Sequence, residues 1–347
     1  MRPTTSRARS RVLIASALVA VAAVASAAAP ATAATRSTTP VLTIRTFSAV
    51  GSESKPDDLT RLGDFIYVAY QNGVGPKGEA SPAGATKSRI QQYSLNGAPG
   101  ASWAVTGKVD GLTADSEHHR LLVTTNEDGN SSFHTLQPGR VHPLRTYTYA
   151  GLSSGGGTDA ISVYHHQILI SASNPSAITV PAAYRVRLVG TTAQLTRLFS
   201  DDARATVANG ATKGKTISLA LADPDSNAVV PRNSPRFGGD FVLDGQADQQ
   251  LVFAHHLGSR NQKLQVLQLH QPVNDTVFVA GARKTIWITD PTANALVAVT
   301  GFRNHDAIAA AVPAAGAFLA RLNLNSGSLT PIRQLALVHP AGLLVTG

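Results

Sequence analysis

Five aspartates recur along the chain in one local pattern. Each is followed two residues later by an aliphatic side chain, then by a polar turn and a second apolar run. They are Asp57, Asp110, Asp159, Asp240 and Asp275. Carboxylate oxygens are the ligands that Ca²⁺ and Mg²⁺ prefer. If the five side chains converge, they are the candidate ligands of a calcium or magnesium ion, and the sequence indicates no other cofactor.

The same aspartates also fit a structural role. An Asp at the entry to a strand accepts backbone N–H groups and fixes the preceding turn. A site seldom needs five copies of one ligand, so repetition favours this structural interpretation. We therefore expect most of the five carboxylates to be bonded to backbone amides. No catalytic residue can be assigned from the sequence.

Histidines offer a second candidate metal chemistry. Three adjacent pairs occur, at His118–His119, His165–His166 and His255–His256. Adjacent side chains on a strand point to opposite faces, so one member of each pair is lost as a ligand. Zinc sites also need a third or fourth ligand close by. We favour solvated turns for these pairs.

The aspartates belong to a repeated strand unit. Segments such as DDLTRLGDFIYVAYQNG and VDGLTADSEHHRLLVTTNEDG each carry two β-rich runs. Turn dipeptides at Asn96-Gly97, Pro138-Gly139 and Ser326-Gly327 then predict further hairpins. Four antiparallel strands per unit make the blade of a β-propeller. We expect these second-run residues to pack between blades: Ile66, Val68, Leu122, Leu169, Val252 and Ile286.

The intervals between unit starts predict the number of blades. Blades of about 40–50 residues favour six, or seven if the 81-residue interval from Asp159 to Asp240 hides another around LALADPDSNAVV. The tail HPAGLLVTG resembles a further start, with Ala341 in place of Asp. We expect this tail and residues 41–49 to complete one blade from both ends of the chain. The sequence thus predicts an all-β, four-stranded-blade propeller.

Residues 1–33 have the features of a signal peptide. Arginines at positions 2, 7, 9 and 11 precede an uncharged run, and Ala31-Thr32-Ala33 offers a cleavage site. We expect a secreted chain whose residues 34–347 form a single propeller domain with no membrane segment left. The formal net charge is +9, of which the leader contributes four. No basic stripe indicates nucleic-acid binding, and we expect a monomer.

The whole pattern resembles a known class. The units DDLTRLGDFIYVAYQNG, LQVLQL with VNDTVFVA, and LNLNSGSLTPI with HPAGLLVTG resemble secreted bacterial propellers of the YVTN and NHL type. The likeness is closest to members without an assigned activity, and a more distant one is to gluconolactonase-type propellers. It implies architecture over nearly all of residues 34–347, whereas chemistry depends on the site.

Two functions follow from these observations. The leading hypothesis is a non-catalytic extracellular propeller that binds an unknown ligand or partner, such as a cell-wall glycan or another protein. The alternative is a metal-dependent, lactonase-like hydrolase with its site at the channel mouth, as the more distant likeness implies. A bound divalent cation that supports lactone hydrolysis would separate the two.

Overall fold

The computed structural model describes residues 41–153, 157–173 and 179–347. The predicted signal peptide, residues 1–33, lies outside the described residues. The described residues belong to one compact unit, Pro40–Gly347. Apart from a 3-10 turn, η1 (Arg333–Leu335), the elements found in these ranges are all strands. The described part of the chain contains no helix with the length and apolarity needed to cross a membrane.

Strand pairing groups the described strands into four-stranded antiparallel units, which we name A to F. Units A to C follow chain order, from the innermost strand to the outermost. Unit A holds β2 (Pro56–Leu62), β3 (Phe65–Tyr70), β4 (Lys87–Ser94) and β5 (Pro99–Thr106). Unit B holds β6 (Val109–Asp115), β7 (Arg120–Thr125), β8 (Ser132–Leu136) and β9 (Leu144–Ala150). Unit C holds β10 (Gly157–Tyr164), β11 (Gln167–Ser173), β12 (Pro181–Val189) and β13 (Thr192–Ser200).

Unit D carries an additional hairpin, and units E and F depart from simple chain order. Unit D holds β16 (Pro224–Val229), β17 (Phe241–Gly245), β18 (Gln250–His255) and β19 (Lys263–Gln268), and a hairpin of β14 (Arg204–Val207) and β15 (Thr216–Ser218) extends its outer edge. Unit E holds β20 (Val273–Phe278), β23 (Ala307–Ala311), β24 (Phe318–Leu322) and β25 (Leu329–Pro331). Unit F holds β26 (Leu343–Thr346), β21 (Thr285–Asp290), β22 (Ala295–Thr300) and β1 (Thr43–Ser48).

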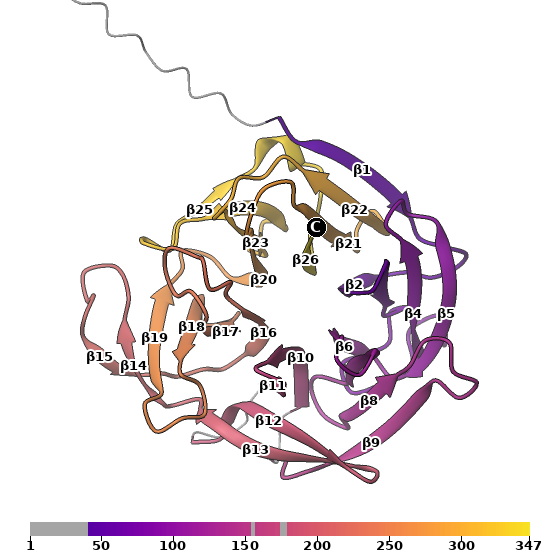
Figure 1. The fold of residues 1–347 in the computed structure, drawn as a ribbon, viewed down its shortest axis with the longest axis horizontal. Coiled ribbons are helices and arrows are strands. Elements are labelled where there is room, and N and C mark those ends of the chain that lie inside the picture. The colour runs from indigo at the N-terminus through magenta and orange to yellow at the C-terminus, as the bar shows by residue number, and fades with distance from the viewer. Residues whose placement is uncertain (1–40, 154–156, 174–178) are drawn as a thin grey trace, which may run out of the picture. The chain divides into compact units, whose positions relative to one another are not determined.

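The innermost strands surround one axis. They contact one another in the order β2, β6, β10, β16, β20 and β26, and β26 contacts β2 again. Figure 1 shows the units arranged around this axis, with β1 on the outside and β26 on the inside of the same unit. The prediction that the two ends of the chain complete one unit is confirmed. The fold is therefore a β-propeller, as the sequence predicts.

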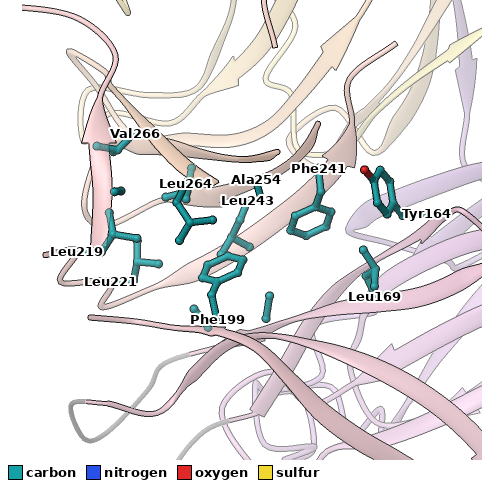
Figure 2. Packing of buried hydrophobic residues seen from close by; sticks show 14 of the residues in the cluster. Tyr164, Leu169, Phe199, Leu219, Leu221, Phe241, Leu243, Ala254, Leu264 and Val266 are labelled. Carbon is teal, nitrogen blue, oxygen red and sulfur yellow. The ribbon is translucent and has the colours of Figure 1, made fainter. Parts of the chain in front are cut away.

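Each unit packs against the next through an apolar cluster. Six such clusters occur among the described residues, one at each boundary between neighbouring units. Figure 2 shows the boundary between units C and D, where Leu169 and Phe199 face Phe241 and Leu243. The six residues predicted to pack between blades are all fully buried. The outermost strands β1 and β5 are mostly exposed, because one of their sheet edges meets solvent.

Two assignments of strands to repeats are wrong. Asp240 precedes β17, the second strand of unit D, whereas the innermost strand is β16. That strand lies within LALADPDSNAVV, where the sequence left room for a further unit. In addition, β21 does not pair with β20, since β20 pairs with β23 and β21 pairs with β26. The hairpin of β21 and β22 thus leaves unit E and enters unit F.

Candidate functional site

The starts of the innermost strands line a central cavity of about 290 Å³. Five of these strands begin with a register shift against their second strand, and all six share one equivalent residue pair between the innermost strand and the second. The inner-strand residues of these pairs are Leu59, Leu112, Ile161, Asn227, Thr276 and Leu343. Two residues earlier stand Asp57, Asp110, Asp159, Asp225, Asn274 and Ala341. The chain therefore repeats a polar side chain at the same place in five of its six described units.

The predicted aspartates divide into three groups. Asp57, Asp110 and Asp159 occupy equivalent positions and line the cavity, as the sequence predicts. Asp275 also lines the cavity, but it is equivalent to Asp58 and lies one residue further along its strand. Asp240 is placed wrongly by the sequence argument. It is absent from the cavity lining, and its Oδ1 lies 2.7 Å from Nδ1 of His255.

Asp58 and Asp275 are structural clamps between neighbouring units. Oδ1 of Asp58 accepts a hydrogen bond from the N–H of Leu59 (2.6 Å), and Oδ2 accepts one from the N–H of Leu112 in unit B (2.5 Å). Asp275 accepts from Thr276 (2.6 Å) and from Leu343 in unit F (2.6 Å) in the same way. Of the five predicted aspartates, Asp275 makes these bonds and Asp110 accepts one from the N–H of Glu127, so the expectation that most of the five are bonded to backbone amides is wrong.

Two glutamines connect the ring of polar side chains. Nε2 of Gln71 donates to Oδ2 of Asp57 at 2.8 Å and lies 3.4 Å from Oδ1 of Asp110. Nε2 of Gln246 likewise donates to Oδ2 of Asp225 at 2.5 Å and to Oδ1 of Asn274 at 3.0 Å. Each glutamine follows the second strand of its unit and bridges to the next unit. Sequence reasoning missed both, although each directly follows the end of a β-rich run.

A lysine lies among the acids of units A and B. Nζ of Lys108 is 2.9 Å from Oδ1 of Asp110 and also pairs with Oε1 of Glu127. The side chain of Asp110 is 1% exposed and that of Lys108 16% exposed. Burial raises the pKa of Asp110, and Lys108 opposes that rise. Burial likewise raises the pKa of Asp57 to about 6, again against the pull of Lys108.

The acids of units C and D form a different arrangement. Asp159 and Asp225 are hydrogen-bonded to each other through their carboxyl groups. Burial raises the pKa of both carboxyl groups, because it disfavours their charged forms. Their interaction raises the pKa of Asp159 and opposes the rise at Asp225, which makes Asp159 the member of the pair that favours the proton. Asp225 was missed because an asparagine, Asn227, replaces the aliphatic residue of the repeat.

The side chains of the cavity do not match the predicted site for a divalent metal ion. Within the described ranges, no three His, Asp or Glu side chains come together in an arrangement that fits a metal ion. The ammonium of Lys108 lies where two of the cavity carboxylates converge. The residues as placed do not fit a divalent cation, and the metal prediction for the five aspartates gains no support from the geometry.

The paired histidines make contacts with acids on separate turns. His118 lies 2.9 Å from Asp115, and His166 lies 2.7 Å from Glu117, as Nδ1 to carboxylate distances. The side chains of both histidines are exposed, at 57% and 83%. The arrangement agrees with the solvated turns that we favour from the sequence.

Comparison with known proteins adds the following likenesses. No family model and no curated protein matches the chain. Among solved structures, a periplasmic gluconolactonase from Pseudomonas aeruginosa is 11% identical with a TM-score of 0.48, covering 84% of this chain and 88% of its own. A protein from Lactobacillus plantarum is 11% identical with a TM-score of 0.48, covering 85% and 89%. The WD40 β-propeller domain of Doa1 is 11% identical with a TM-score of 0.41, covering 82% and 83%.

The assignment of the fold rests on the strand pairing of this chain and not on these likenesses. At such identities they carry no information about the substrate or activity of this chain. The cavity is therefore the feature of this chain that bears on its function.

Proposed function

We propose that this propeller is a hydrolase that opens lactones or similar cyclic esters in its central cavity. The observation that carries the proposal is the interacting pair of buried carboxyl groups Asp159 and Asp225, which stand on the contacting strands β10 and β16 and line a polar cavity of about 290 Å³. A concave site with convergent polar groups and perturbed pKa values is the default place to expect catalysis. Two carboxyl groups in different protonation states supply an acid and a base together.

The pair can divide the work of hydrolysis between its two members. The carboxylate of Asp225 accepts a proton from a water molecule as the water oxygen bonds to the ester carbon. The carboxylic acid of Asp159 donates its proton to the ring oxygen as the ester C–O bond breaks. The product is the open hydroxy acid. Transfer of the proton from Asp225 to Asp159 through their shared hydrogen bond restores the starting state.

The charge of the cavity restricts the class of substrate. Seven acidic side chains line it against one lysine: Asp57, Asp58, Asp110, Glu127, Asp159, Asp225 and Asp275, with Lys108. A phosphorylated or carboxylated substrate would be repelled. Asn227, Asn274 and the carboxylates offer hydrogen-bond partners for hydroxyl groups. The proposed substrate is therefore an uncharged, hydroxylated lactone. It has to be small, because the cavity volume of about 290 Å³ is at the small end of the range for ligand pockets.

Lactone hydrolysis by the purified chain tests this proposal. A panel of neutral sugar lactones is incubated with the wild type, Asp159→Asn and Asp225→Asn, and acid release is followed by pH-stat titration. Loss of one acid–base group should lower kcat by about 10²–10⁴-fold. Asp64→Asn is the matched control, because the side chain of Asp64 is 92% exposed. Both cavity variants should keep the melting temperature near that of the wild type.

Two results would speak against lactone hydrolysis. Saturable binding of a glycan or protein without turnover of any lactone would favour the non-catalytic scaffold. Retained activity in Asp159→Asn would contradict the proposed chemistry. We further propose that the chain is exported, because residues 1–33 have the pattern of a cleaved leader. N-terminal sequencing of secreted protein should begin near Ala34.

A further inference from the structure

We propose that the side-chain amide of Asn274 donates the hydrogen bond that holds the carbonyl oxygen of the lactone in the central cavity, and that Gln246 is the positioning residue that orients this amide. The inference rests on the hydrolase proposed above, to which it adds the group that binds the reacting carbonyl. As water adds to the ester carbon, the carbonyl oxygen gains negative charge, and a donor aimed at it stabilises the transition state.

The carboxylate of Asp225 sets the orientation of two neighbouring amides. In the proposed reaction Asp225 is ionised, and an ionised carboxylate only accepts hydrogen bonds. Gln246 therefore presents its NH₂ group, and Nε2 donates to Oδ2 of Asp225 at 2.5 Å. The same Nε2 donates to Oδ1 of Asn274 at 3.0 Å. Because Oδ1 accepts this bond, the NH₂ group is the end of the Asn274 amide that remains for a ligand.

The NH₂ group of Asn274 is not used by the fold. Within the described ranges, no hydrogen bond joins Nδ2 of Asn274 to another protein group, and the residue lines the cavity. Asp225 and Asn274 bind the same nitrogen of Gln246, so the two side chains lie side by side. The proposed base and the proposed carbonyl donor are therefore neighbours, as the addition of water to a carbonyl requires.

The donors of the other amide and of the lysine in the cavity are already engaged. Nδ2 of Asn227 donates to the C=O of Ala160 at 2.8 Å and lies 3.4 Å from Oγ of Ser171. These bonds connect units C and D. The ammonium of Lys108 is paired with two acids. Asn274 is thus the amide of the cavity lining whose donors can bind a ligand.

The repeat shows what the amide changes. Asn274 stands at the position that carries an aspartate in four other units: Asp57, Asp110, Asp159 and Asp225. A carboxylate at this position would repel the negative charge that grows on the carbonyl oxygen. An amide of nearly the same shape donates to that oxygen instead. Asn274→Asp therefore keeps the shape of the side chain and reverses its interaction with the substrate.

Hydrolysis and ligand binding by Asn274 variants test the proposal. The value of kcat is measured with neutral sugar lactones for the wild type, Asn274→Asp, Asn274→Ala and Asn261→Asp. Binding of glucono-δ-lactam, a neutral probe with a ring carbonyl, is measured by isothermal calorimetry. Both Asn274 variants should lower kcat by about 10²–10³-fold and weaken lactam binding about tenfold. Asn261 is exposed and serves as the matched control.

Gln246→Leu tests the positioning role. Without the donor to Oδ2, the ionised form of Asp225 is less favoured, so the acidic limb of kcat/KM should move to higher pH. The lactam should also bind more weakly, because the amide of Asn274 is no longer held. A merely structural role would lower the melting temperature and leave the acidic limb in place, which would contradict the assignment of Gln246.

Wild-type kcat and lactam affinity in Asn274→Asp would overturn the proposal, and so would a wild-type chain that binds no lactam. If Asp159→Asn loses activity while Asn274→Asp keeps it, the hydrolase stands and the carbonyl donor is wrong. If no lactone is turned over but lactam binding depends on Asn274, the donor stands and the hydrolase is wrong. Asn274→Asp should fold, because four other units carry Asp at this position.

Discussion

Asp244 differs from the residues at the equivalent position of the other units. Thr124 and Thr289 stand at equivalent places on the second strands of units B and F, one residue after Val123 and Ile288. Each of the two threonines connects its own unit to a neighbouring unit. The hydroxyl of Thr124 accepts from the N–H of Gly111 and donates to the C=O of Asp159, and Thr289 does the same with Gly342 and Asp57. Asp244 holds this position in unit D, yet neither of its carboxyl oxygens has a hydrogen-bond partner.

Asp244→Thr is therefore expected to stabilise the protein. Threonine can make the bridge seen at Thr124, whereas the buried, unpartnered carboxyl carries a desolvation cost of about 1–3 kcal/mol. The free energy of unfolding in urea at pH 7 should rise by a comparable amount. Asp64→Thr, at an exposed site, should leave it unchanged.

The pH dependence of this gain checks its cause. Burial raises the pKa of Asp244 well above its ordinary value, with the charge of Asp275 adding to the rise. A raised pKa in the folded state favours folding at low pH, and this contribution is lost as the pH increases. The gain from Asp244→Thr should hence be larger at pH 7 than at pH 4. An equal gain at both would contradict the account.

At the scale of elements, the turns and the first three unit starts could be predicted from the sequence. Gly97, Gly139 and Gly327 all lie in hairpin turns with positive φ, which glycine adopts without strain. Of the later units, the joining of both chain ends in unit F could be predicted, whereas the strands that follow Asp240 and Asp275 could not, because pairing between distant strands decides them. Ala307–Ala311 has strong helix propensity but forms β23, since it is buried between β20 and β24.

In the site, too, the residues of the local repeat could be predicted from the sequence, whereas the residues brought to them by strand pairing could not. Asp57, Asp110 and Asp159 are visible as a local repeat, whereas Lys108 and Glu127 flank that repeat without sharing a pattern. Their pairing appears only when β6 and β7 are aligned. Asp225 is likewise joined to Asp159 across 66 residues of sequence by the contact of β10 with β16.

The side to which each residue of β3 points can be tested by mutation. Ile66 is fully buried between units F and A, and its neighbour Phe65 is 40% exposed. Ile66→Ala should lower the free energy of unfolding by about 2–5 kcal/mol. Phe65→Ala should cost clearly less, since surface changes stay within about 0.5 kcal/mol. Chemical denaturation of both variants checks this, and equal losses would show that the strand phase is wrong.

At the scale of the whole molecule, the propeller gathers acids that a single strand could not hold. Six inner strands bring Asp57 and Asp275 to one cavity although more than two hundred residues separate them. The ring is closed by unit F, where Nε1 of Trp287 donates to Oγ1 of Thr346 in the last strand. Unit F thereby joins the last and the first unit of the ring, because β26 contacts both β20 and β2.

The stability of the ring should fall as the pH rises from 5 to 8. Burial raises the pKa of Asp57 to about 6 and that of Asp275 to about 7. Because the raised values belong to the folded state, their contribution to stability is complete below about pH 4 and is lost as the pH passes 6 and 7. Urea unfolding should report a loss of the order of a few kcal/mol, reduced in Asp275→Asn. A flat profile would contradict these assignments.

The pH dependence of kcat/KM for lactone hydrolysis tests the central claim most directly. Asp225 must be ionised and Asp159 protonated, so the wild-type profile should be bell-shaped, with both limbs belonging to the coupled pair. Because burial raises the pKa of both acids, the acidic limb should lie above the ordinary range of a carboxyl group. Asp64→Asn should reproduce the wild-type profile. A profile without an acidic limb, or the same bell in Asp159→Asn and Asp225→Asn, would contradict the assignment of this pair as the catalytic acid and base.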